Sequence, residues 1–118
     1  MLMSEVVELS RSLISTLIVT TDEVLTEFLA FCASDYHLRI AGSETVQDLL
    51  AAKNVRIVPQ TRSSFLAGLQ LYRARLDKAY SLTDCISMQT MRRESITDAL
   101  TNDRHFQQEG FRAVFRES

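Results

Sequence analysis

The sequence predicts an α/β protein in which a mostly parallel sheet carries helices on both faces. Short apolar runs rich in β-branched residues recur along the chain, and segments with apolar side chains at helical spacing separate them. Strands and helices that alternate in this way build parallel sheets with crossover helices. The 118 residues include only three glycines and one proline, too few for a turn-dense all-β fold.

The first half of the chain is predicted to hold a helix, a strand and two further helices. Residues 3–15 show helical spacing, and the run at 17–19 is typical of a buried strand. A helix follows over 22–34, and the segment after it either extends that helix or connects it to the next. We expect a break at Ala41-Gly42-Ser43 and a new helix over 43–51, with Ser43 as its N-cap.

The middle of the chain repeats the strand–helix order. Residues 55–58 form the second predicted strand, which Pro59 ends because proline cannot donate to a strand ladder. Thr61 is expected to cap a helix that ends near Leu76. Ser81 is expected to begin the next helix, which runs to about residue 92.

Three short elements complete the predicted order. Residues 96–100 read as a strand, residues 103–108 as a short helix or turn closed by Gly110, and residues 113–115 as a final small strand. No repeat, linker or low-complexity tract divides the chain, so we expect a single domain over residues 1–118.

Composition excludes several classes of protein. No apolar run approaches the roughly 20 residues that span a bilayer. The first ten residues carry two acids and no base, which is unlike a secretory signal. Cys32 and Cys85 lack CxxC spacing, so free thiols and a cytoplasmic location are expected.

The near-neutral net charge of −2 hides a separation of charge along the chain. Residues 1–52 contain eight acids and two bases, whereas residues 53–76 contain five bases and no acid. This basic stretch is either a solvated helix face or a surface that contacts phosphate, for which arginine is well suited. The candidate phosphate-binding residues are Arg62, Arg73 and Arg75.

Three acidic residues are candidates for a metal site. Ligand sites in parallel sheets collect at the carboxyl ends of strands, and Glu27 and Asp103 each follow a predicted strand. Asp84 lies in the first turn of the helix that begins at Ser81. Carboxylate oxygens favour Mg²⁺ or Mn²⁺, ions that can activate water for attack on a phosphodiester.

Each acid also has a purely structural interpretation. Asp84 could form a capping box with Ser81, Asp103 could cap the short helix after it, and Glu27 could be a solvated helix residue. A zinc site is not expected, because His37 and His105 show no metal-ligand spacing with each other or with a cysteine. The sequence contains neither a GxSxG elbow nor a phosphate loop.

The sequence resembles the PIN-domain family, and within it the VapC-like toxins of bacterial and archaeal toxin–antitoxin pairs. Upstream, Leu17–Thr21 and the helix that bears Glu27 resemble the second strand and the glutamate-bearing helix of that family. The residues that carry the C-terminal resemblance are SLTDCIS at 81–87, ITDALTNDRHF at 96–106, and Gly110-Phe111.

The resemblance implies a three-layer α/β/α sandwich and Mg²⁺- or Mn²⁺-dependent hydrolysis of RNA. Glu27, Asp84 and Asp103 would then hold the metal and activate water, while Ser81 and Thr83 would orient the site through hydrogen bonds at the helix start. The family also implies an antitoxin protein as partner and a homodimer. His105 is expected to be a core or supporting residue.

The sequence departs from the family at its start, where a hydrophobic strand normally ends in Asp followed by Thr or Ser. Only Met1-Leu2-Met3 precedes Ser4. We therefore expect a shortened domain that lacks its first strand and one acidic ligand. Three explanations stay open: a true start upstream, an inactive relative, or a partner that covers the exposed sheet edge.

Two functions follow from this departure. We favour a shortened or mis-started relative that self-associates and acts as a metal-dependent endoribonuclease, impaired by the missing acid. The alternative is a catalytically inactive module that binds a protein partner or RNA.

Overall fold

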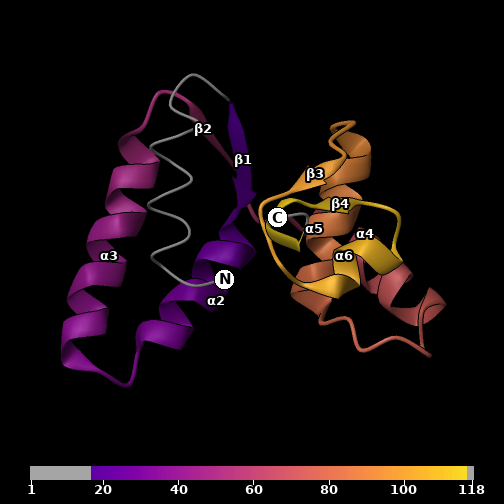
Figure 1. Cartoon of the computed structure of the whole chain (residues 1–118), viewed down its shortest axis with the longest axis horizontal. Coiled ribbons are helices and arrows are strands. Elements are labelled where there is room, and N and C mark those ends of the chain that lie inside the picture. Colours follow the sequence, from indigo (N-terminus) through magenta and orange to yellow (C-terminus); the bar gives the residue numbers. More distant parts are fainter. Residues whose placement is uncertain (1–16, 117–118) are drawn as a thin grey trace. The chain divides into compact units, whose positions relative to one another are not determined.

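The computed structural model describes residues 17–116, which form two compact units: residues 17–60 and residues 61–116 (Figure 1). The helix predicted over residues 3–15 lies outside the described residues, and so does the start of the chain, where a strand was expected to be missing. That expectation stays a prediction. Within residues 17–116, no helix is both long enough and apolar enough to cross a membrane.

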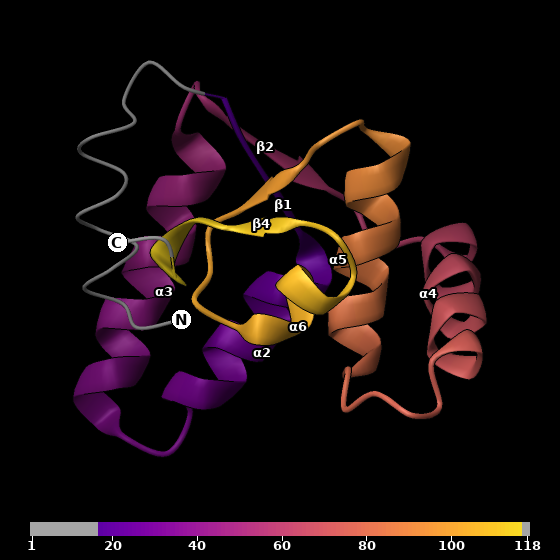
Figure 2. The ribbon, with the colours of Figure 1, turned by 45° about the vertical axis from the view of Figure 1, so that its right-hand side comes forward.

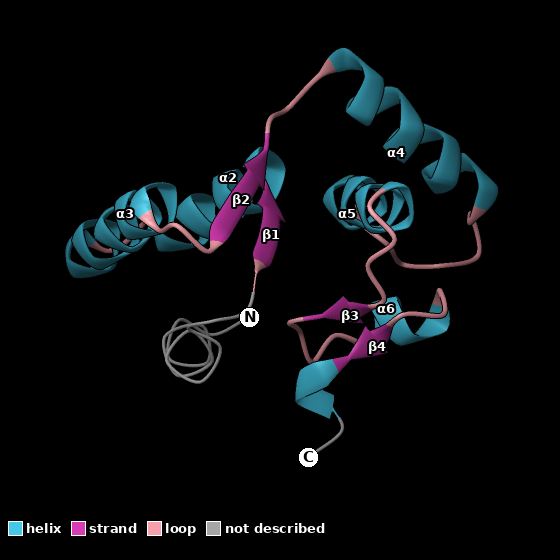
Figure 3. Ribbon diagram, turned by 90° about the horizontal axis from the view of Figure 1, so that it is seen from above, coloured by secondary structure: helices cyan, strands magenta, loops and turns pink. Residues whose placement is uncertain are grey.

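The first unit is a parallel strand pair with two helices in the connection between the strands. Its elements are β1 (Ile18–Thr21), α2 (Asp22–Cys32), α3 (Tyr36–Ala51) and β2 (Val55–Val58). The two strands lie side by side, with Ile18 opposite Val55 (Figure 3). Both strands and their parallel pairing agree with the sequence prediction.

The turn from β1 into α2 is fixed by two side-chain hydrogen bonds. Thr21 is the N-cap of α2, and its hydroxyl accepts a hydrogen bond of 3.2 Å from the amide of Val24. The carboxylate of Asp22 accepts a 2.8 Å bond from the amide of Gln60, just beyond β2. These bonds tie the start of α2 to the ends of both strands.

The predicted helix break at Ala41-Gly42-Ser43 is wrong, because α3 runs without interruption from Tyr36 to Ala51. Its N-cap is Asp35, whose carboxylate accepts a 2.9 Å hydrogen bond from the amide of Leu38. Gly42 is buried within the helix, and a Cβ at this position would lie 2.8 Å from Sγ of Cys32. Glycine is therefore needed here for the close approach of α2 to α3, and it does not mark a turn.

The second unit begins with two helices and continues with short elements (Figure 2). Residues 98–99 and 112–113 form a parallel strand pair, with Ala99 opposite Ala113. Both strands are shorter than predicted, and a 3₁₀ helix occupies the residues that follow the second one. The elements are α4 (Arg62–Ala74), α5 (Leu82–Arg93), β3 (Asp98–Ala99), α6 (Arg104–Gln108), β4 (Arg112–Ala113) and η1 (Val114–Arg116).

The core of the second unit lies under the start of α5. Phe106 on α6 and Phe111, which follows the turn after α6, both pack against this core. The buried core residues are Leu71, Tyr80, Cys85 and Met88. Because Tyr80 directly precedes the N-cap of α5, its burial fixes the direction in which that helix begins.

Candidate metal centre

Asp84 is held at the start of α5 by a reciprocal capping box. The hydroxyl of Ser81, the N-cap residue, accepts a 3.0 Å hydrogen bond from the amide of Asp84. Oδ2 of Asp84 in turn accepts a 3.1 Å bond from the amide of Ser81. The capping interpretation from the sequence is therefore confirmed, and the same bonds fix the direction of the carboxylate.

Asp103 begins the next helix in a similar way. It is the N-cap of α6, and its Oδ1 accepts a 2.9 Å hydrogen bond from the amide of His105. The amide of Asp103 donates a 3.0 Å bond to the hydroxyl of Thr101. The loop between β3 and α6 thus holds this second carboxylate in place.

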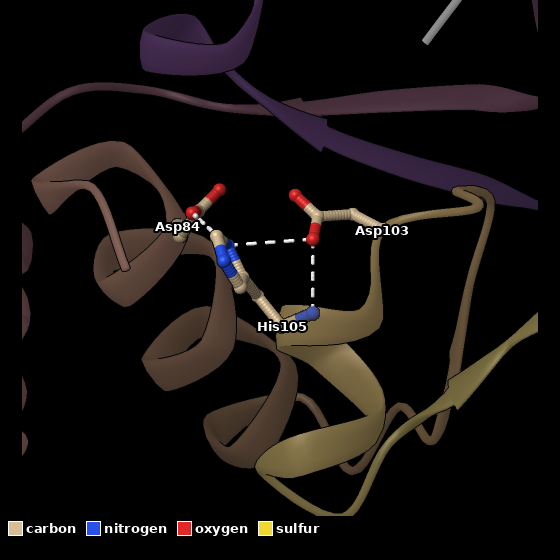
Figure 4. A group of neighbouring side chains, drawn as sticks. All are labelled: Asp84, Asp103 and His105. Atoms are coloured by element: carbon tan, nitrogen blue, oxygen red, sulfur yellow. Dashed lines mark hydrogen bonds and ion pairs between the residues drawn. The ribbon is translucent and has the colours of Figure 1, made fainter. Parts of the chain in front are cut away.

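The imidazole of His105 lies between these two carboxylates (Figure 4). Its Nδ1 is 3.3 Å from Oδ2 of Asp84 and 3.3 Å from Oδ1 of Asp103. One donor atom from each of the three side chains lies within 4.8 Å of the other two. We call Asp84, Asp103 and His105 the metal cluster.

A polar network around the buried carboxylate of Glu109 supports the ring of His105 through Tyr80. The ring of Tyr80 packs against it with 5.4 Å between ring centroids. The hydroxyl of Tyr80 donates a 3.4 Å hydrogen bond to Glu109, whose side chain is only 5% exposed. Arg75 and Arg92 both form ion pairs with Glu109.

The two arginines decide the charge of Glu109. Burial by itself would raise the pKa of this carboxyl group, but hydrogen bonds and charge from Arg75 and Arg92 outweigh burial and lower it. Burial of Tyr80, together with the nearby charge of Glu109, raises the pKa of the tyrosine hydroxyl. At neutral pH the network therefore holds an ionised Glu109 against a neutral Tyr80.

The donor set of the metal cluster fits a divalent cation. Two carboxylates supply charge and hard oxygen atoms, and the imidazole supplies one nitrogen. The side chains are also accessible, since Asp84, His105 and Asp103 are 20%, 21% and 40% exposed. A cation bound here would be held by Asp84 and Asp103 and could still contact water or substrate.

Comparison with known proteins shows the family. The sequence profile of the PIN domain matches residues 4–111. The chain belongs to the PIN-domain family. Comparison with curated protein sequences found no significant match.

A solved structure shows the same fold. VapC20 of Mycobacterium tuberculosis, described as a sarcin–ricin loop cleaving toxin, superimposes with a TM-score of 0.72 at 21% sequence identity. The match covers 83% of this chain and 74% of VapC20. The PIN fold expected from the sequence is confirmed.

The other predicted site residues lie on α2 and at the start of α5. Ser81 forms the capping box with Asp84, and Thr83 lies beside Asp84 in the first turn of α5. Glu27 lies on α2 in the first unit, where its side chain is exposed. Convergence of Glu27 with Asp84 and Asp103, and the supporting role of Thr83, stay predictions.

The three arginines proposed to contact phosphate differ in their surroundings. Arg75 forms an ion pair with Glu109 and thereby has a structural role. Arg62 lies over the ring of Phe65, 5.4 Å from its centroid, and Arg73 is exposed in the last turn of α4. Contact of all three with phosphate stays a prediction.

The sequence interpretation missed the position of His105. The spacing of His105 relative to His37 and the cysteines gives no indication of this position, because the partners of His105 are two carboxylates. One local signal was present: an N-cap aspartate accepts a hydrogen bond from the amide two or three residues later. Asp103 therefore folds back over His105. The contact with Asp84 has no such local signal, because 21 residues separate the two.

Proposed function

We propose that this PIN domain is a metal-dependent endoribonuclease of the VapC-like toxin type. The observation that carries the proposal is the metal cluster, in which two carboxylates converge from the starts of two helices. Support comes from the fold shared with VapC20, which is described as a sarcin–ricin loop cleaving toxin. Nucleases of this family generally depend on a divalent metal ion.

In this proposal Asp84 and Asp103 hold Mg²⁺ or Mn²⁺, and Glu27 is a third acidic ligand. The ion, when bound, supplies an activated water and neutralises charge on the phosphodiester. The amide of Ser81 holds Oδ2 of Asp84 in place, and the hydroxyl of Thr101 stabilises the turn that carries Asp103. Because these bonds exist within the protein alone, the carboxylates need little rearrangement to hold the ion.

Substrate and partner contacts complete the proposal. Arg62 and Arg73 attract the phosphate backbone of RNA, while Arg75 maintains the network under the metal cluster. The protein acts in the cytoplasm as a homodimer under the control of an antitoxin protein.

Cleavage of a sarcin–ricin loop oligonucleotide tests the proposed reaction. Cleavage should require Mg²⁺ or Mn²⁺, stop with EDTA, and fall at least about 100-fold in Asp84→Asn and in Asp103→Asn. Asp77→Asn is the matched control, since Asp77 is an exposed acid that pairs only with the neighbouring Lys78 among the ion pairs described.

Two outcomes would contradict the proposal. Equal cleavage by the wild type and Asp84→Asn would identify the activity as a contaminant. Binding of the RNA without cleavage at any metal concentration would favour the catalytically inactive module.

A further inference from the structure

We infer that His105 is a direct nitrogen ligand of the cation and that it shifts the metal preference of the site from Mg²⁺ to Mn²⁺. The inference rests on the proposed function, because it concerns the same ion. It adds a ligand of a different chemical type to a site that the acids alone would make purely oxygen-based.

The distances around Nδ1 suit a metal ligand as well as a hydrogen bond. A charge-assisted hydrogen bond between imidazole and carboxylate is normally about 2.7–2.9 Å long. Nδ1 of His105 is instead 3.3 Å from an oxygen of each aspartate. Adjacent ligands about 2.0–2.3 Å from one cation are separated by roughly 3 Å, so the distances from Nδ1 to the two oxygen atoms suit neighbouring donors around one ion.

The ring of His105 also has a packing partner. The backbone amide of His105 is bonded to Asp103, and its ring packs against the ring of Tyr80 at a tilt of 58°. Tyr80 is itself buried and bonded to Glu109. A side chain supported in this way presents Nδ1 to the carboxylates at little cost in conformational entropy.

The chemistry of imidazole determines the expected preference. Mg²⁺ takes oxygen ligands almost exclusively and keeps several waters, whereas first-row transition ions accept imidazole nitrogen together with carboxylate. A site of two carboxylates and one imidazole should therefore bind Mn²⁺ more tightly than Mg²⁺. Mn²⁺ is also paramagnetic, so a bound nitrogen can be detected directly.

Pulsed electron paramagnetic resonance of the Mn²⁺-loaded full chain tests the ligand. The wild type should show a nitrogen hyperfine coupling, and labelling with ¹⁵N-histidine should change it. His37→Asn is the matched control, because His37 is the only other histidine and lies exposed on α3. The coupling should persist in His37→Asn and vanish in His105→Asn.

Calorimetric titration tests the preference. Asparagine places an amide oxygen near the position of Nδ1, so His105→Asn should keep Mg²⁺ binding while the ratio of Mn²⁺ to Mg²⁺ affinity falls about tenfold. The labelled wild type needs no variant, so the ligand assignment can be tested even if His105→Asn does not fold.

The outcomes separate this inference from the proposed function. Mn²⁺ binding that is lost in Asp84→Asn but shows no histidine coupling would overturn the ligand role of His105 and leave the proposed metal site standing. An unchanged affinity ratio in folded His105→Asn would overturn the preference. No Mn²⁺ binding in the wild type would overturn both the inference and the metal-dependent mechanism.

Discussion

Nδ1 of His105 lies 3.3 Å from Oδ2 of Asp84, across 21 residues of sequence. The contact brings together the N-terminal ends of α5 and α6, where each aspartate also bonds the backbone of its own helix. Structural and proposed catalytic roles therefore coincide in the same carboxylates. Substitutions can separate the two roles because the helix start needs an acceptor atom, whereas a cation needs negative charge.

Ser81→Ala should mainly reduce folding stability, whereas Asp84→Asn should mainly reduce metal affinity. Ser81→Ala removes the N-cap acceptor of α5 and should lower the free energy of unfolding by about 1 kcal/mol. Asp84→Asn keeps an oxygen for the amide of Ser81, so stability should change by less than about 0.5 kcal/mol.

Mn²⁺ affinity should show the reverse order, with a large loss in Asp84→Asn and a small one in Ser81→Ala. Urea denaturation in EDTA and Mn²⁺ titration measure the two properties. A loss of stability in Asp84→Asn as large as in Ser81→Ala would show that the charge of Asp84, and not only its acceptor atom, stabilises the helix start.

Glu109→Gln should destabilise the second unit in a pH-dependent manner. The substitution weakens the bonds to Arg75 and Arg92 and should cost about 1–2 kcal/mol at pH 7, towards the low end for charged hydrogen bonds because both arginines are partly exposed.

The pKa of Glu109 is lowered in the fold below its ordinary value of 4.5. The stabilisation is therefore fully present above about pH 4.5 and is lost as the pH falls through the lower folded pKa. Urea denaturation of the wild type and Glu109→Gln between pH 7 and pH 3 should show the difference shrinking at the acid end. A constant difference over this range would contradict the assignment, and Asp77→Asn serves as an exposed control.

Gly68→Ala should destabilise the packing of α4 against α5. A Cβ at position 68 would lie 2.3 Å from Cγ1 of Ile86 and 3.1 Å from its backbone, so the helices would have to separate. The cost of overpacking, about 1–3 kcal/mol, should exceed the roughly 1 kcal/mol gained in helix propensity. Thermal and urea denaturation should show lower stability than in Gln70→Ala, an exposed control on the same helix. Unchanged stability would show that the helices adjust freely.

Ser95→Gly and Gly110→Ala should shift stability in opposite directions. Both residues follow the end of a helix with a positive φ, 58° for Ser95 and 93° for Gly110. The amides after them close the helix ends on Met91 and Phe106 respectively. Left-handed backbone is costly for residues with a Cβ, so Ser95→Gly should raise the free energy of unfolding by about 0.5–1 kcal/mol and Gly110→Ala should lower it by about 1 kcal/mol. Chemical denaturation of both variants measures this, and shifts of the same sign would contradict it.

Local signals in the sequence were sufficient for most elements and for two members of the metal cluster. Thr61 and Ser81 were recognised as N-caps because a hydroxyl there bonds an amide three residues later, and the structure contains both bonds. Asp84 and Asp103 are predicted from the sequence because Asp84 lies in the first turn of a predicted helix and Asp103 follows a predicted strand. Periodicity and capping depend on neighbours within a few residues, so they can be read from one chain.

Contacts between distant segments could not be read in this way. The sequence predicts a break at Gly42 because no neighbouring residue distinguishes a glycine in a turn from a glycine at a close helix contact. The reason for the glycine is Cys32, which lies on another helix, α2. Likewise, nothing near Glu109 in the sequence indicates a buried carboxylate, since Arg75 and Arg92 come from other helices.

The sequence by itself determined the order of the elements, the helix caps and the acidic character of the site. The tertiary structure decided the third member of the metal cluster. Whether an imidazole meets two carboxylates depends on how the starts of α5 and α6 approach each other, and the packing of Tyr80 and Glu109 sets that approach. The free energy that stabilises this arrangement comes from burial and from hydrogen bonds between distant residues. No local pattern in the sequence predicts such contacts.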